Sequence, residues 1–198
     1  SMAITVVWLV VVTNAFNFLD NMDGLSGGVA AIAGSFFLVA ALVNQQWFIA
    51  ACLALLVGSL IGFLWFNFPW RGPATIFMGD GGSLVVGFLL GFLTVRTTYV
   101  SEGEAGIGHA WYGVFMPLVV LAIPLYDFCS VTIIRLSQGK SPFVGDLQHF
   151  SHRLTRRGLS KRAAVITIHG FTAVTAIGGI SLAQLRPWQA GLVGVQTV

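Results

Sequence analysis

The chain is organised around one polar stretch, Asn14-Ala15-Phe16-Asn17-Phe18-Leu19-Asp20-Asn21-Met22-Asp23-Gly24-Leu25. An apolar run covers residues 3–13 before it, and a second apolar run begins at Leu25. Asn14, Asn17 and Asp20 are spaced three apart, so a helix would keep them on one broad face. Polar groups at this depth cost free energy unless they serve a function. The stretch predicts a pocket for a nucleotide or a metal–phosphate complex, with a plain capped helix end as the alternative.

The composition is that of a membrane protein. The chain has 198 residues, of which 56% are hydrophobic and 9% charged. Its mean hydropathy is +0.86, whereas soluble domains carry about 25% charged residues. The sequence also shows no internal repeat and no soluble segment. We therefore expect an all-α, polytopic membrane protein in which residues 1–198 form a single helical domain.

Apolar runs of membrane-spanning length set the expected number of helices. A helix needs about 20 residues to cross a bilayer. Six runs meet or approach this length: residues 3–18, 25–43, 47–66, 81–95, 111–136 and 163–185. The fifth run contains Pro117 and Pro124, which predict a bend or a break within that span.

The basic residues are distributed unevenly over the two sides that six crossings define. One side collects Arg71, Arg135, Lys140, Arg153, Arg156, Arg157, Lys161 and Arg162, and the other holds Arg96 and Arg186. Cytoplasmic loops collect Lys and Arg, so the first side, with the basic loop 137–162, is expected to be cytoplasmic. The same side collects Asp20, Asp23, Asp80, Asp127 and Asp146, while Glu102 and Glu104 fall opposite. The pattern predicts an active site that faces the cytoplasm.

The stretch Phe77-Met78-Gly79-Asp80-Gly81-Gly82-Ser83 places a carboxylate between glycines just before an apolar run. A simple helix N-cap with flexible glycines is one interpretation. The other is chemical, because bare glycine amides at a helix N-terminus can approach phosphate oxygens. A carboxylate beside them suits Mg²⁺, which is typically held by one or two carboxylates plus phosphate oxygens.

A third polar stretch, residues 146–154, reads Asp-Leu-Gln-His-Phe-Ser-His-Arg-Leu. His149 and His152 are three apart and would share a helix face. This spacing leaves three interpretations open: a zinc site, a basic loop on anionic headgroups, or a cationic clamp over a diphosphate or a sugar.

These motifs together resemble the polyprenyl-phosphate N-acetylhexosamine-1-phosphate transferases, bacterial glycosyltransferase family 4 enzymes that include the undecaprenyl-phosphate GlcNAc-1-phosphate transferases. The stretch from Asn14 to Leu25 is similar to the family signature, and residues 77–83 are similar to its Phe-x-Gly-Asp-x-Gly-Ser motif. Residues 123–127 resemble Val-Pro-Leu-Phe-Asp, and residues 146–154 resemble Asp-Arg-x-His-x-His-His-Arg-Leu. Leu147 and Ser151 depart from the last pattern, in which arginine and histidine are common.

The resemblance implies a reaction and a role for each matching residue. A sugar-1-phosphate, expected to be GlcNAc-1-phosphate, would pass from a UDP-N-acetylhexosamine to undecaprenyl phosphate, and UMP would leave. Asp80 would be the metal ligand for Mg²⁺, with Mn²⁺ as a substitute, and would form the catalytic set with Asp20 and Asp23. Substrate binding would fall to Asn14, Asn17, His149, His152 and Arg153.

The resemblance also implies partners and a location. We expect a multi-pass protein of the bacterial inner (plasma) membrane that serves cell-envelope polysaccharide synthesis. Its partners would be the nucleotide sugar, the polyprenyl phosphate and the lipid bilayer, with no nucleic acid, and a homodimer is the family expectation. The family carries an Asp-Asp motif in an earlier loop, and this sequence contains no such pair. We therefore expect the C-terminal part of a longer protein, and a non-catalytic relative or a transporter remains an alternative.

Overall fold

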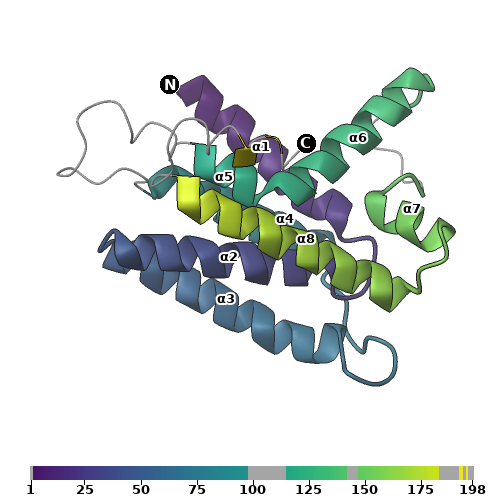
Figure 1. Ribbon diagram of the computed structural model, residues 1–198, viewed down its shortest axis with the longest axis horizontal. Coiled ribbons are helices and arrows are strands. Elements are labelled where there is room, and N and C mark those ends of the chain that lie inside the picture. Colours follow the sequence, from purple (N-terminus) through teal and green to yellow (C-terminus); the bar gives the residue numbers. More distant parts are fainter. Residues whose placement is uncertain (1, 98–114, 142–146, 183–191, 194, 196–198) are drawn as a thin grey trace.

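Every regular element in the described part of the chain is a helix (Figure 1). The computed structural model describes residues 2–97, 115–141, 147–182, 192–193 and 195. Its helices are α1 (Met2–Leu19), α2 (Leu25–Val43), α3 (Trp47–Asn67), α4 (Gly79–Arg96), α5 (Met116–Val120), α6 (Ala122–Ser137), α7 (Phe150–Arg156) and α8 (Lys161–Ser181). The all-α prediction is confirmed for these residues.

Five of these helices, α1, α2, α3, α4 and α8, are long and apolar enough to cross a membrane. They correspond to the first, second, third, fourth and sixth predicted spans. The predicted spans and the observed helices differ by a few residues at their ends, and residues 183–185 lie outside the described part. The expectation of a polytopic helical membrane protein with about six spans is therefore supported.

The fifth predicted span, residues 111–136, is divided where its prolines indicated. Helix α5 ends at Val120 and α6 begins at Ala122, with Leu121 between them. Pro124 has no N–H to donate to the Val120 carbonyl, and its ring crowds that oxygen. Helix α6 diverges from the rest of the bundle in Figure 1. Residues 111–114 of the predicted span lie outside the described residues.

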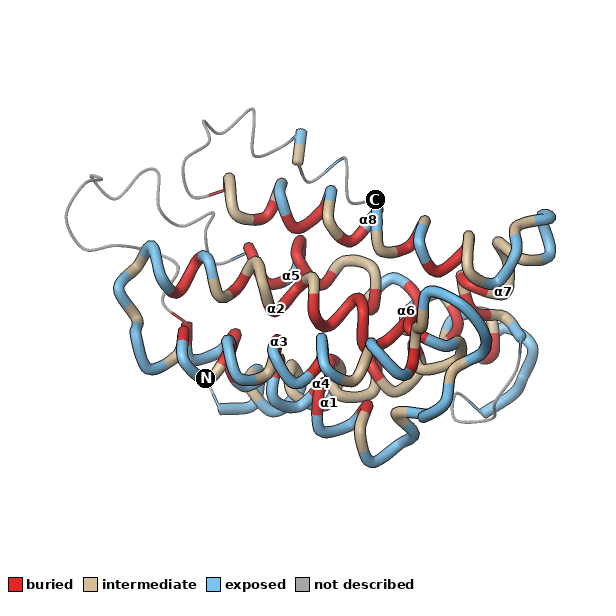
Figure 2. The backbone as a smooth tube through the Cα atoms, turned by 90° about the horizontal axis from the view of Figure 1, so that it is seen from below, coloured by how far each residue is buried: buried red, intermediate tan, exposed pale blue. Residues whose placement is uncertain are grey.

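The helices pack through an apolar core and through close backbone contacts. Figure 2 shows buried residues on the inner faces of the helices and exposed residues on the outer faces. Phe16, Leu25, Phe37 and Ile168 are fully or almost fully buried. A Cβ added to Gly87 of α4 would lie 2.9 Å from the Cα of Thr13 in α1. Glycine thus lets two membrane helices approach closely, as small residues commonly do in lipid.

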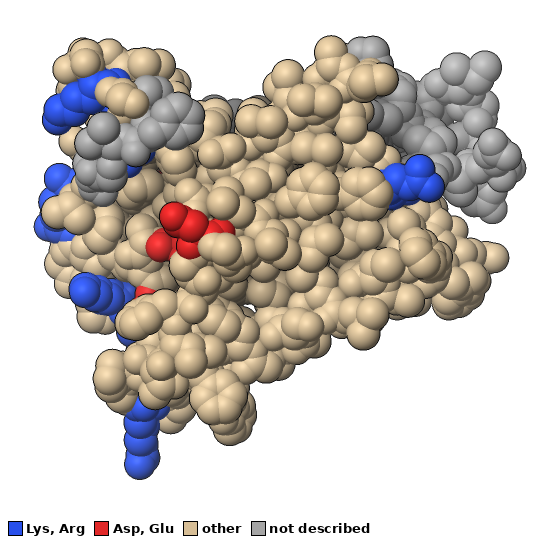
Figure 3. All heavy atoms as spheres, turned by 180° about the vertical axis from the view of Figure 1, so that it is seen from behind, with Lys and Arg blue, Asp and Glu red and all other residues tan. Residues whose placement is uncertain are grey.

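The loops and helix ends that the sequence assigns to the polar side lie together at one end of the helix bundle. The C-terminal ends of α1 and α3 meet there with α7 and the N-terminal ends of α2, α4 and α8 (Figure 1). Lys and Arg side chains gather at this end beside acidic groups in Figure 3. Arg96, by contrast, ends α4 at the opposite end. Asp146, Glu102, Glu104 and Arg186 lie outside the described residues, so their predicted sides are not tested here.

Candidate functional site

Asp80 and Asn17, which the sequence placed in separate motifs, are in direct contact. The Asn17 Nδ2 donates to Asp80 Oδ1 at 2.9 Å and lies 3.0 Å from Ser83 Oγ. Asn17 projects from the last turn of α1, and Asp80 is the second residue of α4. The close packing of α1 on α4 brings the two together. The amide therefore holds the exposed Asp80 carboxylate in place at the start of a membrane helix.

Asp20 joins this pair from the loop that follows α1. The Gly79 N–H donates to the Asp20 carboxylate, and Gly79 adopts a left-handed φ of 62° that glycine tolerates without strain. Burial is the main cause that raises the pKa of Asp20 above its ordinary value. The Gly79 hydrogen bond lowers it, and the negative charges of Asp80 and Asp23 raise it further. Three carboxylates thus share one electrostatic environment.

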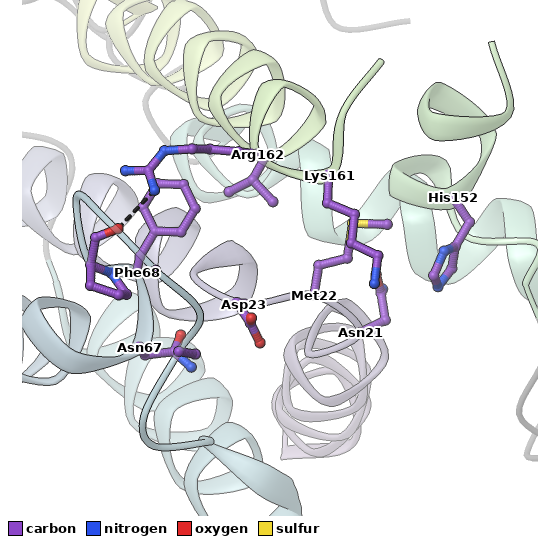
Figure 4. Close-up of a pocket in the computed structure, with 12 residues that line it drawn as sticks. Asn21, Met22, Asp23, Asn67, Phe68, His152, Lys161 and Arg162 are labelled. Atoms are coloured by element: carbon purple, nitrogen blue, oxygen red, sulfur yellow. Dashed lines mark hydrogen bonds between the residues drawn. The ribbon is translucent and has the colours of Figure 1, made fainter. Parts of the chain in front are cut away.

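A pocket of about 290 Å³ includes one of these carboxylates, Asp23, in its lining, whereas Asp20 and Asp80 do not line it (Figure 4). It is lined by Asn21, Met22, Asp23, Asn67, Phe68, Pro69, Gly72, Ala74, His152, Lys161, Arg162 and Val165. In Figure 4 the Asp23 carboxylate lies between the Arg162 and Phe68 wall and the Lys161 and His152 side. The pocket therefore combines one carboxylate with two permanent cations and an imidazole.

Asn67 shapes the floor of this pocket and was not singled out from the sequence. Its Oδ1 accepts from the Gly24 N–H at 2.7 Å, and its Nδ2 donates to the Ile76 carbonyl at 2.8 Å. Gly24 has a φ of 75°, and a Cβ there would lie 2.4 Å from the Phe68 ring. The amide thus links the α1–α2 turn to the α3–α4 loop. The sequence offers one sign of this role, which is that Asn67 is a polar residue at the end of an apolar run.

Arg162 holds the other wall of the pocket. Its Nη1 donates to the Pro69 carbonyl at 2.7 Å, and its guanidinium lies 4.5 Å from the centroid of the Phe68 ring. A stacked arginine of this kind keeps its charge while its position is fixed by the aromatic face. From the sequence, Arg162 could be recognised only as one of several basic residues on the same side of the membrane.

His149 is buried against α6, with only 6% of its surface exposed. Its Nδ1 lies 2.7 Å from Asp127 Oδ2, and its Nε2 lies 3.4 Å from Arg135 Nη2. Asp127, the last residue of the 123–127 motif, therefore pairs with His149 of the basic loop 137–162. Both ring nitrogens of His149 thus have partners inside the protein, and its predicted contact with substrate stays a prediction.

His152 is the histidine that lines the pocket. Burial is the largest cause that lowers the pKa of His152, and the neighbouring His149, Arg156 and Lys161 lower it further. The negative charge of Asp127 acts in the opposite direction. His152 is accordingly held toward its neutral form, which can both donate and accept a hydrogen bond.

Two other predicted binding residues make different contacts. Arg153 Nη2 lies 3.3 Å from Tyr126 Oη and 3.3 Å from Ser130 Oγ, both on α6. Asn14 Nδ2 donates to the Val10 carbonyl of its own helix at 2.8 Å. Neither Arg153 nor Asn14 is among the residues that line the pocket. Their predicted substrate contacts are not tested by this arrangement.

The residues present fit a magnesium ion better than a zinc ion. No group of three or more His, Cys, Asp or Glu side chains that could hold a metal occurs within the described residues. Structural zinc needs four such ligands, and catalytic zinc three. Magnesium is commonly held by one or two carboxylates together with substrate phosphates. Asp80 and Asp20, beside the Gly79–Gly82 backbone, are of that kind.

A second hollow, apolar in character, opens between α3 and α4. It measures about 640 Å³. It is lined by Cys52, Leu55, Leu56, Ser59, Leu60, Phe63, Met78, Gly81, Gly82, Val85, Val86 and Leu89. One end of this groove reaches Gly81, which follows Asp80 directly. This apolar groove therefore includes the residue next to Asp80 in its lining, although Asp80 itself does not line it.

The sequence matches known proteins along most of its length. Residues 1–98 match the family described as glycosyl transferase family 4. A Bacillus subtilis protein named "Probable undecaprenyl-phosphate N-acetylglucosaminyl 1-phosphate transferase" is 34% identical over 186 residues, which cover 93% of this chain and 49% of the relative. A Mycobacterium leprae decaprenyl-phosphate N-acetylglucosaminephosphotransferase is 32% identical over 98% of this chain and 51% of its own length.

A third relative comes from Escherichia coli. Its undecaprenyl-phosphate alpha-N-acetylglucosaminyl 1-phosphate transferase is 30% identical over 88% of this chain and 45% of its own length. The chain thus spans about half the length of the curated relatives it matches. The family match covers α1 to α4, which carry Asn17, Asp20 and Asp80, and the relatives extend the similarity beyond α4. The chain carries a glycosyl transferase family 4 domain in residues 1–98, and its relatives are named as polyprenyl-phosphate N-acetylglucosamine-1-phosphate transferases.

Proposed function

We propose that the protein transfers GlcNAc-1-phosphate from UDP-GlcNAc to undecaprenyl phosphate and releases UMP. The observation that carries this proposal is the convergence of Asn17, Asp20 and Asp80. Asp20 also lies within electrostatic reach of Asp23, which lines a pocket walled by Lys161 and Arg162. The relatives' names supply the sugar phosphate and the lipid carrier. The nucleotide part of the donor is what the resemblance to the transferase family implies.

The proposed reaction needs positioning and charge neutralisation rather than a covalent intermediate. An oxygen of the lipid phosphate attacks the β-phosphorus of the nucleotide sugar, and the bond from that phosphorus to the UMP oxygen breaks. Lys161 and Arg162 line the pocket, where their charges would neutralise the diphosphate, and neutral His152 would orient it through a hydrogen bond. Mg²⁺, held by Asp80 with Asp20 beside it, would supply further neutralisation of the phosphate charge.

We also propose that this end of the molecule faces the cytoplasm of a bacterial cell. The described Lys and Arg residues gather at the site end, and Arg96 lies at the other end (Figure 3). Positive charge near the ends of membrane helices favours the cytoplasmic side. A cytoplasmic site would also meet nucleotide sugars directly, without a need to transport them.

The groove between α3 and α4 offers a place for the acceptor's hydrocarbon chain. Its lining is almost wholly apolar and it ends at Gly81, beside Asp80. A lipid phosphate could lie with its headgroup at the carboxylate–metal site and its isoprenoid chain along Val85 and Leu89 of α4. This placement keeps the charged end at the membrane surface and the chain within the bilayer.

A donor screen tests the proposed function. The full-length protein in detergent would be supplied with undecaprenyl phosphate and, in turn, UDP-GlcNAc, UDP-GalNAc or UDP-glucose, with Mg²⁺ or with EDTA. We expect UMP release that requires the lipid phosphate and the divalent cation and that is fastest with UDP-GlcNAc. An absence of UMP release with every donor, from a folded sample, would contradict the proposal.

A further inference from the structure

Asp127 is a fully buried carboxylate, 1% exposed, that the proposed reaction does not use. Both of its oxygens are engaged at the start of α7. The Oδ1 accepts from the Phe150 N–H at 2.6 Å, and the Oδ2 lies 2.7 Å from the Nδ1 of His149. One side chain of α6 therefore fixes both the backbone and the side chain at the beginning of α7.

Arg135 determines which nitrogen of His149 carries the proton. Its Nη2 lies 3.4 Å from the Nε2 of His149, and a guanidinium can only donate. The Nε2 must therefore present its lone pair to Arg135. In this arrangement the Nδ1–H donates to the Oδ2 of Asp127. Each N–H in this arrangement therefore faces an acceptor, and each acceptor faces an N–H.

These contacts connect to the carboxylate site through α1 and its following loop. The His149 ring lies edge-on to Phe18 with centroids 6.2 Å apart, and the Arg135 guanidinium lies 5.1 Å from the same ring's centroid. Phe18 follows Asn17 directly in the sequence. Ser151 Oγ also donates to Asn21 Oδ1 at 2.5 Å. Ser151, which departs from the family pattern, thus ties α7 to the α1–α2 loop.

We propose that Asp127 is a positioning residue, which with His149 and Arg135 forms a latch that seats α7 and aims His152 into the nucleotide-sugar pocket. The inference rests on the proposed function, because that function gives His152 its task. The ring of His152 lies 6.3 Å from that of His149, the residue that immediately precedes α7. A shift of α7 would therefore move His152 relative to Lys161 and the bound diphosphate.

The latch makes opposite predictions for two substitutions of His149. In His149→Asn the amide nitrogen takes the place of Nδ1 and keeps the hydrogen bond to Asp127. In His149→Ala that bond is lost and the buried carboxylate loses one partner. We expect His149→Ala to lower kcat at least about tenfold, because small displacements of catalytic groups are costly. His149→Asn should recover most of that loss with a KM for donor near the wild-type value.

Asp127→Asn tests the other half of the latch. An amide at this position can accept from only one of the Phe150 N–H and the His149 Nδ1–H, and its own N–H faces the other donor. If His149 changes tautomer to accommodate it, the Nε2–H then faces Arg135. We expect a loss of kcat of similar size to that of His149→Ala. Cys129→Ser, an exposed substitution two residues along α6, should leave kcat unchanged.

A measurement that needs no activity separates this inference from the proposed function. Trypsin cleavage after Arg153, Arg156 and Arg157 of the full-length protein, followed by mass spectrometry well below the Tm, reports how firmly α7 is seated. Cleavage should be at least about tenfold faster in Asp127→Asn and His149→Ala than in wild type, since a lost buried hydrogen bond changes an opening equilibrium by that order. His149→Asn and Cys129→Ser should stay close to wild type.

Three results would overturn the latch. The first is full activity and unchanged cleavage in Asp127→Asn. The second is a His149→Asn protein that resists trypsin like wild type and yet is as inactive as His149→Ala, which would make His149 a reacting group. The third is unchanged cleavage in every variant. If Asp127→Asn or His149→Ala fails to fold, the comparison of His149→Asn with wild type still decides. A wild-type protein without transferase activity would overturn the proposed function, while the cleavage rates would still test the latch.

Discussion

At the scale of single residues, the site depends on carboxylates that the fold brings together at a free-energy cost. Asp20 is partly buried and lies near the negative charges of Asp80 and Asp23, so ionising Asp20 is unfavourable without a cation. The hydrogen bonds from Asn17 to Asp80 and from Gly79 to Asp20 offset part of this cost. Such an arrangement is expected where a divalent cation and phosphates bind.

The raised pKa of Asp20 has a consequence for stability that can be measured without metal. A carboxyl group whose pKa is raised by folding is easiest to accommodate when both states are protonated, below the ordinary value of about 3.9. Its contribution is lost as the pH rises through the folded-state pKa. In EDTA, Asp20→Asn should therefore raise the Tm at pH 7.5, and the gain should vanish as the pH falls toward 4. A Tm lowered by the substitution at pH 7.5 would contradict the burial of a charged Asp20.

At the scale of elements, the position of Asp80 relative to Asn17 depends on how closely α1 approaches α4. Gly87 allows that approach, because a Cβ there would lie 2.9 Å from the Thr13 Cα and 3.1 Å from the Phe16 Cβ. The Thr13 Cα is a backbone atom and the Phe16 Cβ is bonded directly to the backbone. Neither atom can move aside as the end of a flexible side chain could. The two helices must separate if the space is filled.

Gly87→Ala should therefore destabilise the protein by about 1–3 kcal/mol, the usual cost of overpacking. Gly62→Ala on α3 is the matched control, because a Cβ at Gly62 meets nothing within 4 Å. That control should be neutral or slightly stabilising, since alanine favours helix over glycine by about 1 kcal/mol. Thermal unfolding in detergent measures both. Equal Tm changes for the two variants would show that α1 and α4 do not pack closely at Gly87.

If the hydrocarbon chain of the acceptor lies in the apolar groove between α3 and α4, filling this groove should weaken acceptor binding. Val85→Trp would fill the groove, whereas Phe92→Trp on the same helix changes an exposed position outside the groove lining. We expect Val85→Trp to raise the KM for undecaprenyl phosphate about tenfold, the effect of losing a few buried methylenes' worth of contact. The KM for UDP-GlcNAc and for a short farnesyl phosphate should change much less. A Val85→Trp protein with wild-type KM for the long acceptor would leave the groove without this role.

Much of this arrangement could be predicted from the sequence because its signals are local. The apolar runs predicted the helices, and Pro117 and Pro124 predicted the break within the fifth span. The distribution of arginine and lysine predicted which helix ends form the polar end of the bundle. The contact between Asn17 and Asp80 could not be read directly, because it depends on the pairing of α1 with α4 across 63 positions. Asn67 was missed for the same reason, since its partners lie in two different loops. Asp127 and His149 both belong to motifs that resemble the family's patterns. Their burial and the hydrogen bond between them depend on how α6 packs against the start of α7, which the sequence does not show.

At the scale of the whole molecule, the distribution of charge predicts how the protein sits in its membrane. The α3–α4 loop with Arg71 is at the site end, and the α2–α3 turn with Gln45 is at the other end. Arg71→Cys and Gln45→Cys, each in a background without Cys52 and Cys129, place single thiols at these ends. We expect an impermeant maleimide to label Gln45→Cys in intact spheroplasts and Arg71→Cys only after permeabilisation. The reverse labelling would put the site outside the cytoplasm.

The role of Asp80 can be measured as Mg²⁺-dependent UMP release from UDP-GlcNAc and undecaprenyl phosphate by the full-length protein carrying Asp80→Asn. If the carboxylate that Asn17 holds at the start of α4 is the metal-binding group, release should fall at least about 1,000-fold while the Tm changes little, because the transferred phosphate charge is left without its main stabilisation. Release at the wild-type rate, with the same dependence on Mg²⁺, would contradict the account.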